Sequence, residues 1–420
     1  PHFSPQLLMK KTLLFAFALT VSAFFAACSS DDLDTTVVNV MPPAVSSEAN
    51  QSLFPEEGKA KMVSKNGAEA LFALLKSPKF NMEAATKLHN ATITDSQWNV
   101  IKEYEDKNLK GATETETYKR IFKWCHDSLT YTHDGPSLEP YDVFTNRRCI
   151  CQGYANLCKT MLLTQGIPAF GVNGYYAAYG AHAWLYAYVD KIWRVCDPTG
   201  YRQHGMSELN KYKNDLLVQR TEIEIFEDEN FGYNYDEYRL NVCRVKKCDG
   251  EALTVPFSVA GFKISSFLLE HSLPSNVRQL YFGTNIQSLG TQGYPLFGRA
   301  NSVEEAFVAP GNRLISSQDG VIYHGTGTNV YYIPTAIRRL VLKPMKVIGK
   351  NTVYDLPNLE EIVISEGTTT IESYAFESCP SLKRIYVPQS VTSFAKDALY
   401  RCPDDVEILK GSTGIHHVTM

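Results

Sequence analysis

The stretch from Arg147 to Thr199 is the most informative part of this chain. It reads RRCICQGYAN over 147–156, GAHAW over 180–184 and WRVCDPT over 193–199. These segments supply a thiol, an imidazole and a carboxylate, in that order along the chain. A nucleophilic thiol needs such partners, because an imidazole takes its proton and a carboxylate orients the imidazole.

The thiol of Cys151 is predicted to lie at the N-terminus of a helix. Apolar residues follow it at helical spacing, and Gly166 with Pro168 ends the run. Free backbone N–H groups and the positive end of the helix dipole stabilise a thiolate at this position. The position therefore favours the nucleophilic form of cysteine.

The imidazole and the carboxylate are predicted to share one face of a β-hairpin. Residues 182–189 alternate small or polar with aromatic side chains, Asp190-Lys191 offers a turn, and residues 192–196 resume an apolar run. Facing residues of a hairpin with an even-length loop have indices that sum to an odd number, as 182 and 197 do. We therefore expect His182 and Asp197 to be opposed or diagonal neighbours.

The order and local sequence of these segments resemble the transglutaminase-like superfamily over about residues 95–200. The matching residues are Cys151-Gln152-Gly153-Tyr154-Ala155, His182-Ala183-Trp184 and Asp197-Pro198-Thr199. The resemblance implies a papain-like α+β core in which the cysteine is the nucleophile, the histidine the base and the aspartate the orienting acid.

Two residues depart from the pattern of that family. Cys149 stands where the family usually has Gly, and Leu185 where it often has Asn. The first departure leaves two candidate thiols, and the distance to the Gly-Tyr-Ala segment favours Cys151 as the nucleophile. The second departure, Leu185, removes an amide that in the family would contact the substrate or residues behind the active site.

Simpler interpretations of the cysteines stay open. Without a partner motif, Cys125, Cys158 and Cys196 are typical of small buried hydrophobic residues. Cys149 and Cys151 lack the two-residue spacing of a structural zinc site, so we expect neither a metal nor a cofactor. A core that keeps the fold and binds without turnover is the alternative to an enzyme.

Composition limits the classes to which the chain can belong. Its 420 residues suggest two or three domains, and 44% hydrophobic content is ample for packed cores. The formal net charge is −4 without a stripe of Lys and Arg, so a nucleic-acid partner is not expected.

Residues 1–28 are predicted to be a lipoprotein signal peptide that starts at Met9. Two lysines precede an apolar run, and the small residues before Cys28 resemble a bacterial lipobox. The resemblance implies a lipid on Cys28 and anchoring to the outer membrane of a bacterial envelope, on its surface or periplasmic face. A single membrane span is the alternative, although the run is short and Asp31-Asp32 soon follows.

Three segments follow the signal peptide. Residues 29–60 are rich in Ser, Asp, Thr, Pro and Glu, which predicts a flexible tether. Residues 61–205 hold the catalytic motifs behind predicted helices at about 68–76, 94–110 and 114–129. Residues 206–272 are predicted to be a β-rich connecting unit. Its Cys243 and Cys248 either form a disulfide across a turn or stay reduced.

A 23-residue period marks the C-terminal part, residues 273–420. Leu359-x-x-Ile362-x-Ile364 recurs as Leu382-x-x-Ile385-x-Val387, with fainter copies from 277 and 337. Such a period predicts a β-solenoid in which Cys379 and Cys402 are stacked free thiols. The repeats resemble the BspA-type leucine-rich repeats of bacterial surface proteins, which implies a protein or glycan ligand.

Together these patterns predict a lipid-anchored cysteine enzyme of the cell envelope. Cys151 would attack a peptide or carboxamide carbonyl of a protein or peptide substrate and form a thioester. Water as acceptor gives a protease or amidase, and an amine gives a transglutaminase. We rank hydrolysis slightly higher, because the resemblance implies bacterial relatives that are often proteases or amidases and because the aqueous cell exterior favours water. The alternative is a non-catalytic surface adhesin with a degenerate transglutaminase fold.

Overall fold

The computed structural model describes nine segments of the chain. They are residues 48–63, 67–176, 180–199, 206–208, 216–291, 294–295, 299–325, 327 and 329–411. All of them belong to one compact unit. The predicted signal peptide, Cys28 and residues 29–47 of the predicted tether lie outside these residues. Among the described residues, no helix has the length and apolar character needed to cross a membrane.

The N-terminal half contains the four predicted helices and one, α4, that the sequence did not predict. They are α1 (Gly67–Leu75), α2 (Asp95–Asn108), α3 (Glu114–Ser128), α4 (Pro140–Asn146) and α5 (Cys151–Thr164), with short 3-10 turns at Gln51–Leu53 and Ala84–Thr86. A capping box joins Thr94 and Gln97 at the start of α2. Helix α5 ends at Gly166, whose φ of +76° is left-handed, and the Gly166 N–H donates to the Leu163 carbonyl at 3.0 Å.

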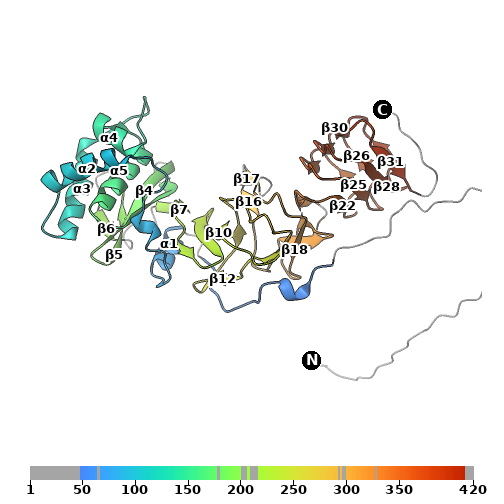
Figure 1. The fold of residues 1–420 in the computed structure, drawn as a ribbon, viewed down its shortest axis with the longest axis horizontal. Helices are drawn as coiled ribbons and strands as arrows, with labels where there is room; N and C mark the ends of the chain where they lie inside the picture. Colours follow the sequence, from blue (N-terminus) through green and yellow to red (C-terminus); the bar gives the residue numbers. More distant parts are fainter. Residues whose placement is uncertain are drawn as a thin grey trace, which may run out of the picture. The chain divides into compact units, whose positions relative to one another are not determined.

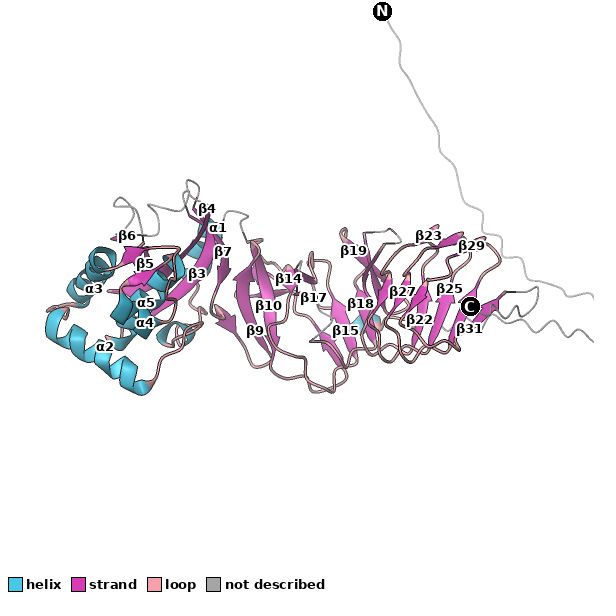
Figure 2. Ribbon diagram, turned by 90° about the horizontal axis from the view of Figure 1, so that it is seen from above, coloured by secondary structure: helices cyan, strands magenta, loops and turns pink. Residues whose placement is uncertain are grey.

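The helices pack on one mixed sheet, shown in Figures 1 and 2. Its strands run in the order β14-β10-β9-β7-β3-β4-β5-β6, with β8 beside β9. Their bounds are β3 (Ala169–Tyr176), β4 (Gly180–Val189), β5 (Ile192–Cys196), β6 (Met206–Glu208), β7 (Leu216–Thr221), β8 (Phe226–Glu227), β9 (Phe231–Asp236), β10 (Arg239–Val245) and β14 (Ser266–Phe267). The predicted hairpin is confirmed as β4 and β5, which join through Asp190 and Lys191, both with positive φ.

The two faces of this sheet border different hydrophobic cores. Leu185, Ala187 and Val189 point into a core formed with α2, α3, α4 and α5. Trp184 and Tyr186, which alternate with them, join a second core that also contains residues of α1. At the hairpin, helices therefore cover both faces of the sheet: α2 to α5 lie on one face and α1 on the other.

The β-rich segment at 206–272 continues this sheet, which differs from the separate unit predicted for it. Strands β6 to β10 and β14 all belong to the sheet that contains the β4–β5 hairpin. Cys243 and Cys248 are both free thiols: Cys243 is buried and donates to the Gly232 carbonyl at 3.3 Å. Strand-like composition does not show which strands will pair. The sequence therefore could not predict that this segment adds strands to the sheet of β3, β4 and β5.

The C-terminal half is the predicted solenoid. Its coils stack the parallel strands β11 (Ala252–Thr254), β15 (Gln279–Phe282) and β18 (Glu305–Val308) in one sheet, and β22 (Arg339–Leu342), β25 (Glu361–Ile364), β28 (Arg384–Val387) and β31 (Glu407–Lys410) in another. Figure 2 shows the second set as a regular ladder. The first coil begins at Ala252, ahead of the predicted boundary at 273.

Shorter strands complete the coils. They are β12 (Ser258–Val259), β13 (Phe262–Lys263), β16 (Gly290–Thr291), β17 (Tyr294–Pro295), β23 (Val347–Ile348), β24 (Val353–Tyr354), β26 (Thr370–Ile371), β27 (Phe376–Glu377), β29 (Ser393–Phe394) and β30 (Leu399–Tyr400). A separate sheet of β19 (Ile315–Gln318), β20 (Val321–His324) and β21 (Val330–Tyr332) lies in sequence between β18 and β22. Cys379 and Cys402 are free, as predicted, and in hydrogen-bond contact.

Residues 48–60 form a strap, although the sequence predicts a flexible tether for them. The ring of Phe54 packs edge-to-face on Tyr281 at 5.4 Å, and the Leu53 carbonyl accepts a hydrogen bond from Thr254 Oγ1 at 2.5 Å. Just beyond it, Lys61 bridges to Phe262. The described end of the predicted tether is therefore held on the first coils.

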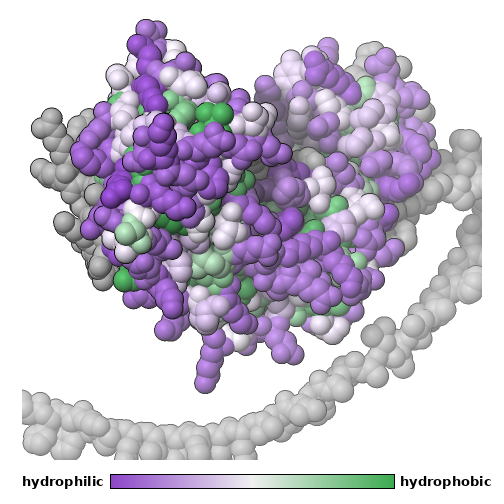
Figure 3. All heavy atoms as spheres, turned by 60° about the vertical axis from the view of Figure 1, so that its left-hand side comes forward, coloured by the Kyte–Doolittle hydropathy of each residue, from purple (hydrophilic) through white to green (hydrophobic). Residues whose placement is uncertain are grey.

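Hydrophilic residues dominate the face seen in Figure 3, where hydrophobic residues form small separated patches.

Candidate active site

Cys151 is the first residue of helix α5 and keeps part of its surface in solvent. The residue before it, Ile150, is extended and follows the short strand β2 (Arg148–Cys149), which pairs with β1 (Thr130–Tyr131). Gly153 permits this close approach: a Cβ there would lie 2.5 Å from the Cys149 Cβ and 2.6 Å from the Ser137 carbonyl oxygen. The glycine of the motif therefore lets β2 reach the first turn of the helix.

Cys149 is the second candidate thiol, and the structure places it in the core. Its side chain is fully buried in the core that contains α5. Burial, together with the neighbouring Cys151 thiol, raises the pKa of Cys149 to about 12. Cys149 is therefore a neutral thiol at physiological pH, whereas the partly exposed Cys151 faces the hairpin.

His182 and Asp197 meet on one face of the hairpin. Leu185 lies opposite Cys196, so His182 and Asp197 are diagonal neighbours, one of the two arrangements expected. His182 Nε2 lies 2.8 Å from Asp197 Oδ2, and the carboxylate is 4% exposed. With Nε2 engaged by the carboxylate, Nδ1 is the nitrogen left for a thiol.

Hydrogen bonds link His182 to the thiol of Cys151 and shift both pKa values. Burial opposes the Cys151 thiolate, but hydrogen bonds from His182 and from the backbone N–H groups of Ala183 and Gln152 outweigh it and lower the pKa of Cys151. Burial likewise disfavours the imidazolium, yet contacts to Asp197 and Cys151 raise the pKa of His182 to about 9. The geometry thus favours a thiolate beside an imidazolium.

Two aromatic rings flank His182, and another ring pair joins β1 to helix α5. Trp184 stacks on His182 with ring centroids 5.8 Å apart, and Tyr176 lies 6.3 Å from the same imidazole. Tyr131 stacks on Tyr154 at 6.3 Å, and its side chain is 46% exposed. The rings limit the orientations of the imidazole and give the site an apolar wall.

Behind the thiol, two amides on α5 fix the loop beside the site. Gln152 Nε2 donates to Asn156 Oδ1 at 2.9 Å, and Asn156 Nδ2 donates to the Leu138 carbonyl at 3.0 Å. Asn156 is 3% exposed. This pair was not predicted from the sequence, although two amides four residues apart on one helix face are a local signal.

A buried ion pair was also not predicted from the sequence. Lys159 Nζ lies 2.7 Å from both carboxylate oxygens of Glu222 and 2.7 Å from the His89 carbonyl oxygen. The two charged side chains are 1% and 4% exposed. Glu222 also accepts from the Gly171 N–H, so it joins the nucleophile helix to strand β3.

The remaining cysteines and histidines of the core are structural. Cys125, Cys158 and Cys196 are fully buried, and Cys158 Sγ lies 3.8 Å from Cys196 Sγ. His126 Nδ1 lies 3.2 Å from the Pro198 carbonyl oxygen. Among the described residues, no group of three His, Cys, Asp or Glu side chains is arranged to hold a metal ion.

The geometry agrees with a family comparison. Residues 104–198 match the profile of the transglutaminase-like superfamily. This chain carries a transglutaminase-like core. Residues 331–413 match six copies of the BspA type leucine rich repeat region. The transglutaminase-like core and the repeats are thus two separate parts of one chain.

Solved structures include proteins similar to each part. A protein provisionally assigned as a cysteine protease from Cytophaga hutchinsonii is 20% identical with a TM-score of 0.24, covering 27% of this chain and 41% of its own. The periplasmic domain of TgpA from Pseudomonas aeruginosa is 18% identical with a TM-score of 0.24, and the match covers 28% of this chain and 46% of that domain. A leucine-rich repeat protein from Eubacterium ventriosum is 18% identical with a TM-score of 0.25, and the match covers 35% of this chain and 43% of that protein.

This chain spans less than half the length of each of these three structures. Among proteins with curated descriptions, none matches this chain.

Proposed function

We propose that this protein is a cysteine enzyme that cleaves or transfers acyl groups of peptide or carboxamide bonds. The proposal depends on one observation: a partly exposed thiol at a helix N-terminus contacts an imidazole whose other nitrogen lies 2.8 Å from a buried carboxylate. Cys151 is the proposed nucleophile, His182 the base and Asp197 the orienting acid.

The proposed reaction begins when the Cys151 thiolate attacks the carbonyl carbon of a protein or peptide substrate. The backbone N–H of Cys151 donates to the developing oxyanion. Collapse of the tetrahedral intermediate expels an amine that takes a proton from the His182 imidazolium, which leaves a thioester. Water or a second amine, deprotonated by His182, then attacks the thioester and regenerates the thiolate.

Hydrolysis is ranked above transfer because the thiol keeps part of its surface in solvent. Water then competes with any amine for the thioester. The protein would act as a protease or amidase, with transglutaminase chemistry when an amine is held at the site.

The proposed location is the outer membrane of a bacterial envelope, through a lipid on Cys28. The lipobox-like sequence before Cys28 supports it. In cells, Cys28→Ala should move the protein from the membrane fraction to the soluble fraction. The repeats are proposed to bind a protein or glycan partner beside the substrate.

Selective alkylation tests the proposed nucleophile. A fluorescent iodoacetamide at pH 7 should label Cys151 ahead of the other described thiols, because its pKa is lowered and its surface is partly exposed. Labelling should fall sharply in His182→Ala and persist in Cys149→Ser. Equal labelling of several thiols, or none at Cys151, would favour a degenerate core that binds without turnover.

A further inference from the structure

The solenoid strands carry one outward position that recurs in every coil. In the register of the two parallel sheets it is occupied by Thr254, Tyr281, Phe307, Val341, Val363, Tyr386 and Leu409. The residues on either side of it, such as Leu280 and Ile385, point into the solenoid core. We call these seven side chains the outer row.

The strap covers the first half of the outer row. Besides the Leu53 and Phe54 contacts, the Asn50 N–H points to the Tyr281 hydroxyl at 3.5 Å, and Glu57 accepts a hydrogen bond from Thr284. Tyr281 in turn lies 5.0 Å from Phe307, ring centre to ring centre. Tyr281 is 1% exposed and Phe307 3%, while Thr254 keeps part of its surface in solvent.

No described segment covers the second half of the outer row in this way. Val341, Tyr386 and Leu409 keep part of their surface in solvent, whereas Val363 between them is 7% exposed. Tyr386 occupies the position that Tyr281 has in the first sheet. A ladder of charges flanks these residues on the same face: Arg384 lies 3.1 Å from Glu361 and 3.2 Å from Glu407. The charges neutralise each other, so this face does not select a uniformly charged polymer.

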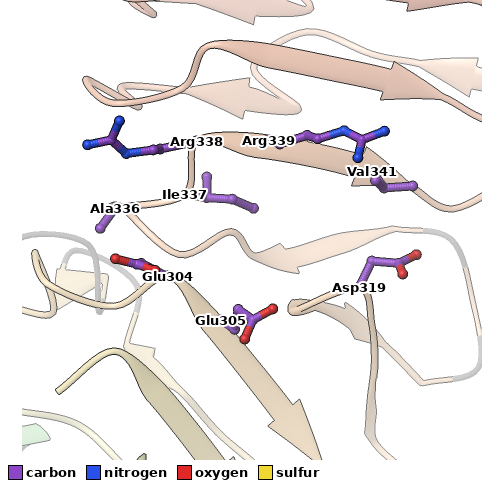
Figure 4. Close-up of a pocket in the computed structure, with 8 residues that line it drawn as sticks. All are labelled: Glu304, Glu305, Asp319, Ala336, Ile337, Arg338, Arg339 and Val341. Atoms are coloured by element: carbon purple, nitrogen blue, oxygen red, sulfur yellow. The ribbon is translucent and has the colours of Figure 1, made fainter. Parts of the chain in front are cut away.

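A pocket of about 300 Å³ lies where the covered half meets the uncovered half. Figure 4 shows Glu304 and Glu305 on one side and Arg338, Arg339 and Val341 on the other. On its own side of the pocket Arg338 pairs with Glu360 at 3.2 Å, and Glu305 accepts a hydrogen bond from the Gln279 amide at 2.7 Å. The pocket therefore presents both signs of charge to a ligand that crosses it.

We propose that the uncovered half of the outer row, from Val341 to Leu409, binds an extended polypeptide segment of a partner protein. The strap shows the mode of binding: an aromatic side chain packs on the row while main-chain groups bond to the coils. A polypeptide also brings charges of both signs to the pocket. The inference rests on the binding role proposed for the repeats and is independent of the proposed catalysis.

A peptide with the sequence of the strap, changed at two positions, tests the proposal. Pro55 of the strap packs against Gly283, where a Cβ would meet the proline ring at 2.8 Å, and the equivalent residue after Tyr386 is Pro388. The probe is therefore a fluorescent peptide of residues 48–60 with Pro55→Gly and a photoreactive benzoylphenylalanine in place of Phe54. It is added to the full chain carrying Cys151→Ala, which prevents turnover.

We expect saturable binding, with cross-links confined to residues 339–410. Affinity should fall at least tenfold for Tyr386→Lys and for Val341→Glu, and for a peptide with Phe54→Ala. It should not change for Tyr354→Lys, the matched control, which lies on β24 and is 50% exposed. The variants are compared at equal folded fraction, measured by thermal melting.

Three results would overturn the proposal: no saturable binding, equal affinity of the Phe54→Ala peptide, or cross-links at residues 252–308, which would indicate exchange with the strap. Labelling of Cys151 by iodoacetamide, measured in the Tyr386→Lys variant of the unsubstituted chain, should be unchanged. That readout separates a failure of docking from a failure of the proposed catalytic function.

Discussion

In the transglutaminase-like core, residues far apart in the sequence meet at one site, whereas each solenoid coil contacts the next at a nearly fixed separation. Lys159 reaches Glu222 63 residues away and His89 70 residues away. In the solenoid, Lys383 pairs with Glu360 and Arg384 with Glu361, both 23 residues away. A change in the core is therefore expected to act at a distance, and a change in the solenoid to stay local.

The largest expected effect is loss of the proposed nucleophile. Cys151→Ala should reduce turnover by roughly 10⁴-fold or more, because no other group replaces the thiolate. Stability should stay within about 0.5 kcal/mol, since the side chain is partly exposed. The measurements are acyl transfer from a peptide library and a thermal melt.

Cys149→Ser is the control for this prediction. The Cys149 side chain is fully buried in the core, so the variant should retain activity when folded. An inactive Cys149→Ser beside an active Cys151→Ala would reverse the assignment of the nucleophile.

The second effect tests long-range coupling in the core. Glu222→Ala leaves the Lys159 ammonium buried without its carboxylate, which should lower the free energy of unfolding by about 3 to 5 kcal/mol. Urea denaturation followed by tryptophan fluorescence measures it. Lys159→Met combined with Glu222→Leu should recover much of the loss, because no unpaired charge then stays buried.

The third effect tests the local character of the solenoid. Ile385→Ala removes a fully buried side chain and should cost about 2 to 5 kcal/mol, with no change in Cys151 labelling. Arg384→Ala, on the surface of the same strand, should cost about 1 kcal/mol or less. Hydrogen exchange should place the Ile385→Ala effect in the neighbouring coils. A loss of Cys151 labelling would show that the two regions are coupled.

The smallest expected effect concerns the carboxylate. Asp197→Ala should slow turnover by about 10- to 1000-fold, since the residue only orients and stabilises the imidazolium. Its removal also takes away contacts that raise the pKa of His182, so that pKa should fall from about 9. An unchanged rate would show that Asp197 has no part in the reaction.

The dependence of activity on pH also tests the His182–Asp197 pair. In the native protein, activity should rise as pH passes the lowered pKa of Cys151 and fall as pH passes about 9, where His182 loses its proton. The stability from His182 is complete below its ordinary pKa near 6.5 and is lost as pH rises through about 9. In Asp197→Ala the alkaline limb of the activity profile should move to lower pH.

The sequence alone determined the features that depend on local spacing. Helix periodicity placed Cys151 at the start of α5, the two-residue turn set the register that brings His182 to Asp197, and the 23-residue period predicted the solenoid. Each of these signals lies within one element or between neighbouring elements, where chain geometry fixes which side chains meet.

Only the tertiary structure decided which distant segments pair. Strand β7 pairs with β3 in the sheet that holds His182, Glu222 reaches Lys159, and Phe54 packs on Tyr281 more than 200 residues away. A glutamate beside a strand and a phenylalanine in a polar segment have many partners available to them in the sequence. The choice among them depends on burial and packing, which exist only once the whole chain has folded.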